Sequence, residues 1–143
     1  RMYIVGGETS PRNKRLCEVT QECLYEAIKA IRPGVDLTIV GDIIQPIAEK
    51  NNFSVVRDYC GHGVGREFHQ EPEVLHFRNR NHFTLEPGMT FTIEPMVNMG
   101  HWDVCGDELD PTGWIVLTSD GLPSAQWEHT FVMTENGVEI LSH

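Results

Sequence analysis

The spacing of the apolar residues changes once along this chain, near Phe53, and that change constrains the fold more than any other feature. Before it, apolar side chains recur at steps of three and four over residues 11–31 and again over residues 37–50, which predicts two amphipathic helices. After it, short apolar runs are separated by Gly, Pro, Asn and Asp, which predicts strands joined by turns. We therefore expect an α+β fold in which two helices pack on one face of a mostly antiparallel sheet.

Local signals give the expected ends of these elements. Ser10 followed by Pro11 predicts the start of the first helix, because Ser caps free N–H groups and Pro suits the first turn. Asp36 is the expected cap of the second helix, and Pro46 predicts a kink or a disrupted turn inside it. The expected strands are residues 2–5, 54–56, 89–96, 114–118, 125–132 and 138–141.

The bulk composition excludes several classes of partner. A chain of 143 residues that is 40% hydrophobic is sufficient for one domain with a core. Its net charge of −10 argues against a nucleic acid or an anionic membrane as partner, since both bind clustered Lys and Arg. No apolar run approaches the roughly 20 residues that span a bilayer. The four cysteines form no Cys-x-x-Cys pair and are expected to be free thiols.

Residues 59–69, which read YCGHGVGREFH, hold the densest group of chemically active side chains. Glycines flank His62 on both sides, and His69 follows seven positions later. Glycine permits backbone conformations that other residues avoid, so we expect a tight turn here that brings the His62 ring close to a metal or a substrate.

Two carboxylates later in the sequence are expected to point toward the same site as His62. Glu94 lies in the apolar run FTIEPM, and Glu128 lies between Trp127 and another apolar run. A carboxylate in apolar surroundings is costly unless a cation or hydrogen-bond donors meet it. Each residue alone more often has a structural role, but together one histidine and two carboxylates suit a divalent first-row metal. In this interpretation His62, Glu94 and Glu128 are metal ligands, and His69 acts on the substrate.

Several motifs together resemble those of type I methionine aminopeptidases, in order and approximate spacing, across nearly the whole chain. They read CGHGVG, FH, EPGM, FTIEPM, GW and EHT, beginning at Cys60, Phe68, Glu86, Phe91, Gly113 and Glu128. The resemblance implies a pita-bread fold and a centre of two divalent ions, with Co, Mn, Fe and Zn all admissible. It also implies removal of the initiator methionine from nascent proteins whose second residue is small.

The resemblance also implies a role for each matching residue. His62 and Glu94 would bind one metal, and Glu128 would bridge both. Glu94 would also act as a proton acceptor, and His69 would contact the scissile carbonyl region. The methionine pocket would be bordered by the aromatic residues Phe68 and Trp114. The family further suggests a monomer in the cytoplasm, with an organelle left open.

Two metal ligands of the family have no counterpart in this sequence. The family has five protein ligands, and the resemblance places Arg1 just after the second of two aspartates. We therefore expect residues 1–143 to be the C-terminal part of a single catalytic domain, with the missing N-terminal part as a partner. Two divalent ions carry four positive charges, and the negative charges of Glu94, Glu128 and a hydroxide do not balance them. The chain alone is accordingly expected to bind at most one metal weakly and to have little activity.

Three alternatives stay open on the sequence. Another pita-bread peptidase, acting on X-Pro bonds, would share the ligands. A catalytically inactive relative used as a binding module is favoured if the encoded protein begins at Arg1. Finally, the histidines and glutamates would be purely structural if Glu94→Gln left metal content and activity unchanged. Residues 98–113 are acidic and irregular, and we expect them to form a surface loop.

Overall fold

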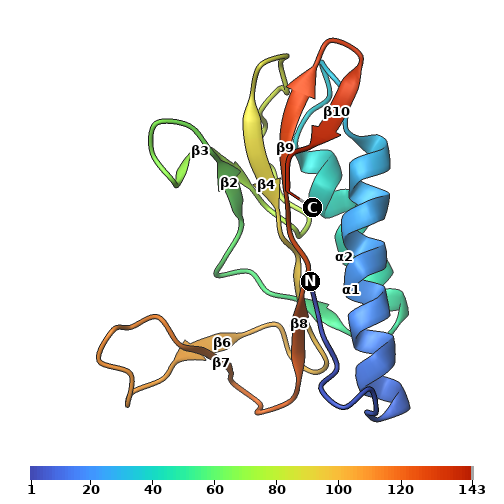
Figure 1. Ribbon diagram of the computed structural model, residues 1–143, viewed down its shortest axis with the longest axis vertical. Coiled ribbons are helices and arrows are strands. Elements are labelled where there is room, and N and C mark those ends of the chain that lie inside the picture. The colour runs from blue at the N-terminus through green and yellow to red at the C-terminus, as the bar shows by residue number, and fades with distance from the viewer. Residues whose placement is uncertain (143) are drawn as a thin grey trace.

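The computed structural model describes residues 1–142 and confirms the predicted order of two helices followed by strands. Figure 1 shows α1 (Pro11–Ala30) and α2 (Thr38–Lys50) together on one side of the strands. The strands are β1 (Ser54–Val55), β2 (Gly61–Gly63), β3 (Gln70–Val74), β4 (Thr90–Ile93), β5 (Met96–Asn98), β6 (Val104–Gly106), β7 (Val116–Thr118), β8 (Ser124–Gln126), β9 (His129–Thr134) and β10 (Gly137–Ile140).

The helix ends follow their sequence signals in one case and depart from them in the other. The Ser10 hydroxyl accepts the Asn13 N–H at 3.1 Å, which confirms the predicted cap of α1. The residue at the N-cap position of α2 is Leu37, so the predicted cap at Asp36 is one position off. The Asp36 carboxylate still accepts the Thr38 N–H at 2.9 Å. Neither helix is long and apolar enough to cross a membrane.

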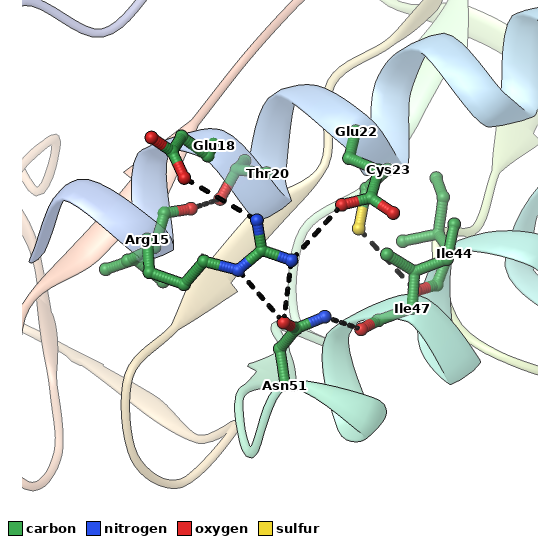
Figure 2. A network of polar contacts seen from close by, with 9 residues as sticks. Arg15, Glu18, Thr20, Glu22, Cys23, Ile44, Ile47 and Asn51 are labelled. Atoms are coloured by element: carbon green, nitrogen blue, oxygen red, sulfur yellow. Dashed lines mark hydrogen bonds and ion pairs between the residues drawn. The ribbon is translucent and has the colours of Figure 1, made fainter. Parts of the chain in front are cut away.

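A polar network joins the two helices on their outer side, as Figure 2 shows. The Arg15 guanidinium of α1 donates to the Asn51 side-chain oxygen at 3.1 and 2.9 Å. Asn51 ends α2, and its amide donates in turn to the Ile47 carbonyl at 2.9 Å. Beneath this network the Cys23 thiol, which is buried, donates to the Ile44 carbonyl. These contacts hold the two helices against each other.

The strands form three antiparallel sheets. A five-stranded sheet has the order β10-β9-β4-β2-β3, and a three-stranded sheet has the order β1-β5-β8. The helices pack mainly on the smaller sheet, with α1 against β5 and β8 and α2 against β1. The third sheet is the β6–β7 hairpin, which projects away from the helices in Figure 1. The predicted α+β arrangement is confirmed, with the sheet divided in two.

Some sequence predictions were wrong in detail. Residues 2–5 form no strand, because no described strand pairs with them, and the exposed fraction of Val5 is 94%. Strands β2, β3 and β6 were not predicted, because glycine and proline in β2 and β3 and exposure in β6 hide the usual alternation. Residues 98–113 are not one irregular loop, because β6 lies within them.

Glycine is required at position 41 because another segment of the backbone approaches the helix closely there, although glycine lowers helix propensity. A Cβ atom at Gly41 would lie 2.0 Å from the Phe77 carbonyl oxygen and 2.4 Å from its carbon. Here α2 passes directly under the segment after β3, and the Gln45 side chain accepts the Arg78 N–H at 2.8 Å. The backbone of that segment cannot move away without losing this contact.

We expect Gly41→Ala to lower the free energy of unfolding by about 1–3 kcal/mol, as overpacking does. Helix propensity alone would give the opposite sign, a gain of about 1 kcal/mol. The measurement is urea denaturation, with Gly106→Ala as the matched control because a Cβ there meets nothing within 4 Å. A Gly41→Ala protein as stable as the parent would contradict the close approach of Phe77.

Candidate metal centre

Glu94 and Glu128 lie where two neighbouring chain segments leave one sheet and enter the other. Residues 94–95 join β4 of the larger sheet to β5 of the smaller one. Residues 127–128 join β8 back to β9 in the opposite direction. Pro95 has no N–H to donate, which suits a break in the hydrogen-bond ladder. Both carboxylates therefore lie at the junction of the two sheets.

The strand register places these two carboxylates opposite each other. Ile93 pairs with His129 on one side of the junction, and Met96 pairs with Gln126 on the other. The same register continues across the gap, so that Glu94 faces Glu128. Like charges directly opposite on a sheet repel. Burial raises the pKa of Glu94, and the charge of Glu128 raises it further.

His62 points its free ring nitrogen at Glu94. Its Nδ1 lies 3.0 Å from the Gly63 carbonyl oxygen, which only accepts, so Nδ1 carries the proton. In the neutral ring Nε2 then bears a lone pair, and it lies 3.5 Å from Glu94 Oε1. With the ring neutral and the carboxyl ionised, both atoms only accept hydrogen bonds, and a cation between them would satisfy both. The Nδ1 bond also fixes the tautomer that metal ligation needs.

The glycines beside His62 serve a different purpose from the predicted tight turn. His62 is the middle residue of β2, and a Cβ at Gly61 would meet the Thr92 carbonyl oxygen at 2.5 Å. At Gly63 a Cβ would meet the Glu71 carbonyl oxygen at 2.1 Å. The prediction of a tight turn was wrong. Glycine is needed because both neighbouring strands approach β2 closely, and a register shift after His62 helps to direct its ring.

His69 and Phe68 return to His62 through the loop between β2 and β3. The ring centroids of His62 and His69 are 4.3 Å apart, and those of Phe68 and His69 are 4.5 Å apart. Both side chains are exposed, and the exposed fraction of Phe68 is 74%. The loop therefore brings together the two histidines that the sequence separates by seven positions.

All the predicted site residues line one cleft of about 900 Å³. Trp114 also lines it, from the loop that connects β6 to β7, with an exposed fraction of 82%. Five carboxylates line the cleft, from Asp58, Glu71, Glu73, Glu94 and Glu128. No Lys or Arg is among its described lining residues, so the cleft is strongly negative and suits cations.

Three residues that support Glu94 were missed by sequence reasoning. The Thr92 hydroxyl donates to Glu94 Oε1 at 2.8 Å, and the Gln126 amide lies 3.2 Å from Oε2. Buried His76 accepts the Glu94 N–H on Nε2 at 3.1 Å. A threonine, a glutamine and a histidine at these positions carry no sequence signal of their own. Only the fold shows that they converge on one carboxylate.

The residues present fit part of a metal site. Donors about 2.1 Å from one tetrahedral ion lie about 3.4 Å apart, close to the 3.5 Å between His62 Nε2 and Glu94 Oε1. Within residues 1–142 no group of three His, Cys, Asp or Glu side chains is compact enough to hold an ion. Glu128 is exposed and stands on the same cleft without closing this pair into a three-ligand cluster. The donor set is thus suitable in chemistry and incomplete in number.

Residues 1–135 match the model of metallopeptidase family M24, and the chain belongs to that family. Within it, the chain is similar to methionine aminopeptidases. It is 51% identical over 143 residues to the enzyme of Escherichia coli strain K12, a match that covers 99% of this chain and 53% of that one. The chain therefore spans about half the length of the curated relatives it matches. Membership of a metallopeptidase family implies a divalent metal cofactor.

Solved structures confirm the predicted pita-bread fold. The methionine aminopeptidase of Thermotoga maritima superposes with a TM-score of 0.88 at 47% identity, over 94% of this chain and 53% of that one. Prolidase from Pyrococcus furiosus superposes with a TM-score of 0.71 at 25% identity, over 98% of this chain and 35% of that one. The resemblance to methionine aminopeptidases is thus confirmed in sequence and in structure, and the X-Pro alternative has the weaker likeness.

The buried ring of His76 makes stability depend on pH. Desolvation lowers the pKa of His76 from 6.5 to about 3. The unfolded chain therefore takes up a proton below pH 6.5 that the folded chain refuses, so stability falls as pH falls. We expect a loss of about 1 kcal/mol between pH 6 and pH 5 from this group alone, measured by urea denaturation with a chelator present.

His76→Gln is the control for this experiment, because it keeps an acceptor for the Glu94 N–H and does not titrate. The raised pKa of Glu94 acts in the opposite direction and is common to both proteins, so the difference between them isolates His76. Equal pH dependence in the two proteins would show that the folded His76 ring accepts a proton near its ordinary pKa.

Proposed function

We propose that the protein carrying this sequence is a metal-dependent methionine aminopeptidase. It would remove the initiator methionine from nascent proteins whose second residue is small, with residues 1–143 as the C-terminal part of one catalytic domain. The observation that carries the proposal is the convergence of a lone pair of His62 with the facing carboxylates Glu94 and Glu128. The similarity to methionine aminopeptidases over nearly the whole chain supports this substrate over others.

The proposed centre holds two divalent ions, with Co, Mn, Fe and Zn all suited to imidazole and carboxylate ligands. His62 and Glu94 would bind one ion, and Glu128 would bridge both. When bound, such ions polarise a carbonyl and lower the pKa of water to near neutral. The negative cleft would also attract the free amino group at the start of a peptide.

The chain's own residues divide the remaining work. Glu94 would accept the proton of the attacking water, a role that suits a carboxyl whose pKa is raised by burial. His69 is exposed beside His62 and would donate a hydrogen bond to the scissile carbonyl oxygen as charge develops on it. Phe68 and Trp114 stand on the cleft and would enclose the methionine side chain.

We expect the intact protein carrying this sequence to release methionine from a Met-Ala-Ser peptide and to leave X-Pro peptides uncut. A chelator should abolish the activity, and Glu94→Gln should lower kcat at least about 100-fold, because it removes the proton acceptor and a metal ligand. Glu139→Gln in β10, a surface carboxylate outside the cleft, is the control. Faster release from X-Pro substrates would replace the proposal with the prolidase alternative, and an unaffected Glu94→Gln enzyme would leave only a structural role.

Residues 1–143 alone are expected to bind at most one Mn²⁺ or Co²⁺, weakly, and to have little peptidase activity. The physical reason is that residues 1–142, which the structure describes, offer one close pair of donors and one exposed carboxylate for two ions. Calorimetric titration of the chain measures the stoichiometry, with His62→Ala as a control that should abolish binding. Two tightly bound ions per chain would show that the ligand set is complete without further residues.

A further inference from the structure

The Thr92 hydroxyl lies between the two ligands of the proposed metal pair. It accepts the backbone N–H of His62 at 3.0 Å and donates to Glu94 Oε1 at 2.8 Å. Both roles are fixed by the partners, since a backbone N–H only donates and an ionised carboxylate only accepts. One oxygen atom therefore joins the strand that carries His62 to the carboxylate that faces it.

This hydroxyl also limits the directions in which Glu94 can bind anything else. The Thr92 hydroxyl takes one lone pair of Oε1, the same oxygen that lies 3.5 Å from His62 Nε2. Gln126 holds the other carboxylate oxygen from β8. With both oxygens held, the remaining lone pair of Oε1 is left for the space in front of Nε2.

Burial makes these contacts difficult to replace by water. The exposed fraction of Thr92 is 2%, and that of the side chains of His62 and Glu94 is 14% and 13%. A buried N–H that loses its acceptor has no solvent to turn to. Without the hydroxyl, both the His62 backbone and the Glu94 carboxylate would therefore be free to move relative to each other.

We propose that Thr92 is a positioning residue that sets the separation of His62 and Glu94, so that both can bind one divalent ion. This inference rests on the proposed metal centre. Groups that orient metal ligands in this way typically change metal affinity 10–100-fold when they are removed. The methyl group of Thr92 has no part in this role, and a serine would perform it.

The test measures metal binding by the intact protein carrying this sequence, without reference to activity. Thr92→Val removes the hydroxyl at nearly constant shape and should weaken Mn²⁺ or Co²⁺ binding about 10–100-fold in a calorimetric titration. The visible absorption bands of bound Co²⁺ should change in shape, because the ligands meet the ion at altered angles. Thr92→Ser should retain an affinity within about 3-fold of the parent.

Thr90→Val is the matched control, because the Thr90 hydroxyl lies on the same strand and donates to the Val64 carbonyl without touching Glu94. It should bind Co²⁺ with the parent's affinity and spectrum. If Thr92→Val does not fold, the pair Thr92→Ser and Thr92→Ala decides the matter, since the two differ mainly in the hydroxyl. Serine should then bind at least about 10-fold more tightly than alanine.

Two results would overturn the inference by itself while the parent still binds metal. One is a Thr92→Val protein with the parent's affinity and Co²⁺ spectrum, and the other is a Thr92→Ser protein as weak as Thr92→Ala. A parent protein that binds neither Mn²⁺ nor Co²⁺ would overturn the proposed metal centre and this inference with it. The failure of the inference is thus distinguishable from the failure of the proposed function.

Discussion

The whole site depends on two carboxylates held face to face where a pair of antiparallel segments passes from one sheet to the other. The segments keep one register through the junction, so Glu94 and Glu128 have no freedom to separate along the strands. Their repulsion is unfavourable, and it adds to burial, the larger cause, in raising the pKa of Glu94. A cation removes that cost, which is why the architecture itself, beyond the residue types, points to a metal.

The same junction explains the demands made on its neighbours. Strand β2 must lie close enough to β4 for His62 to reach Glu94, and a side chain at Gly61 would push these two strands apart. A side chain at Gly63 would instead push β2 away from Glu71 of β3. The Thr92 hydroxyl then takes the His62 N–H. On the other side, burial lowers the pKa of His76, whose ring accepts the backbone N–H of Glu94. Each of these residues is constrained by the position of one carboxylate.

What the sequence could predict was limited to local patterns and to residues with strong chemical preferences. The helices follow from apolar spacing within one element, and Glu94 and Glu128 stand out because carboxylates are unusual in apolar runs. The strand at residues 2–5 was wrong because an apolar run becomes a strand only where a partner pairs with it. Strand β2 was predicted to be a turn because of its glycines. These glycines are needed instead because the backbone at residues 71 and 92 approaches them closely, which no local sequence pattern reveals.

The residues that support Glu94 could not be predicted for the same reason. The roles of Thr92 and Gln126 follow only from their short distances to Glu94 in the folded chain. The role of Trp114 at the methionine pocket stays a prediction, and its structural environment was not predicted. It is largely exposed, but its backbone is fixed, because the Asp110 carboxylate accepts the N–H groups of Trp114 and Ile115 at 2.7 Å. Hydrogen bonds from Thr112 and this backbone lower the pKa of Asp110 to about 2, so the anchor stays charged at neutral pH. Because the backbone of Trp114 is already fixed, its exposed side chain could pack on an apolar group with little further loss of conformational entropy.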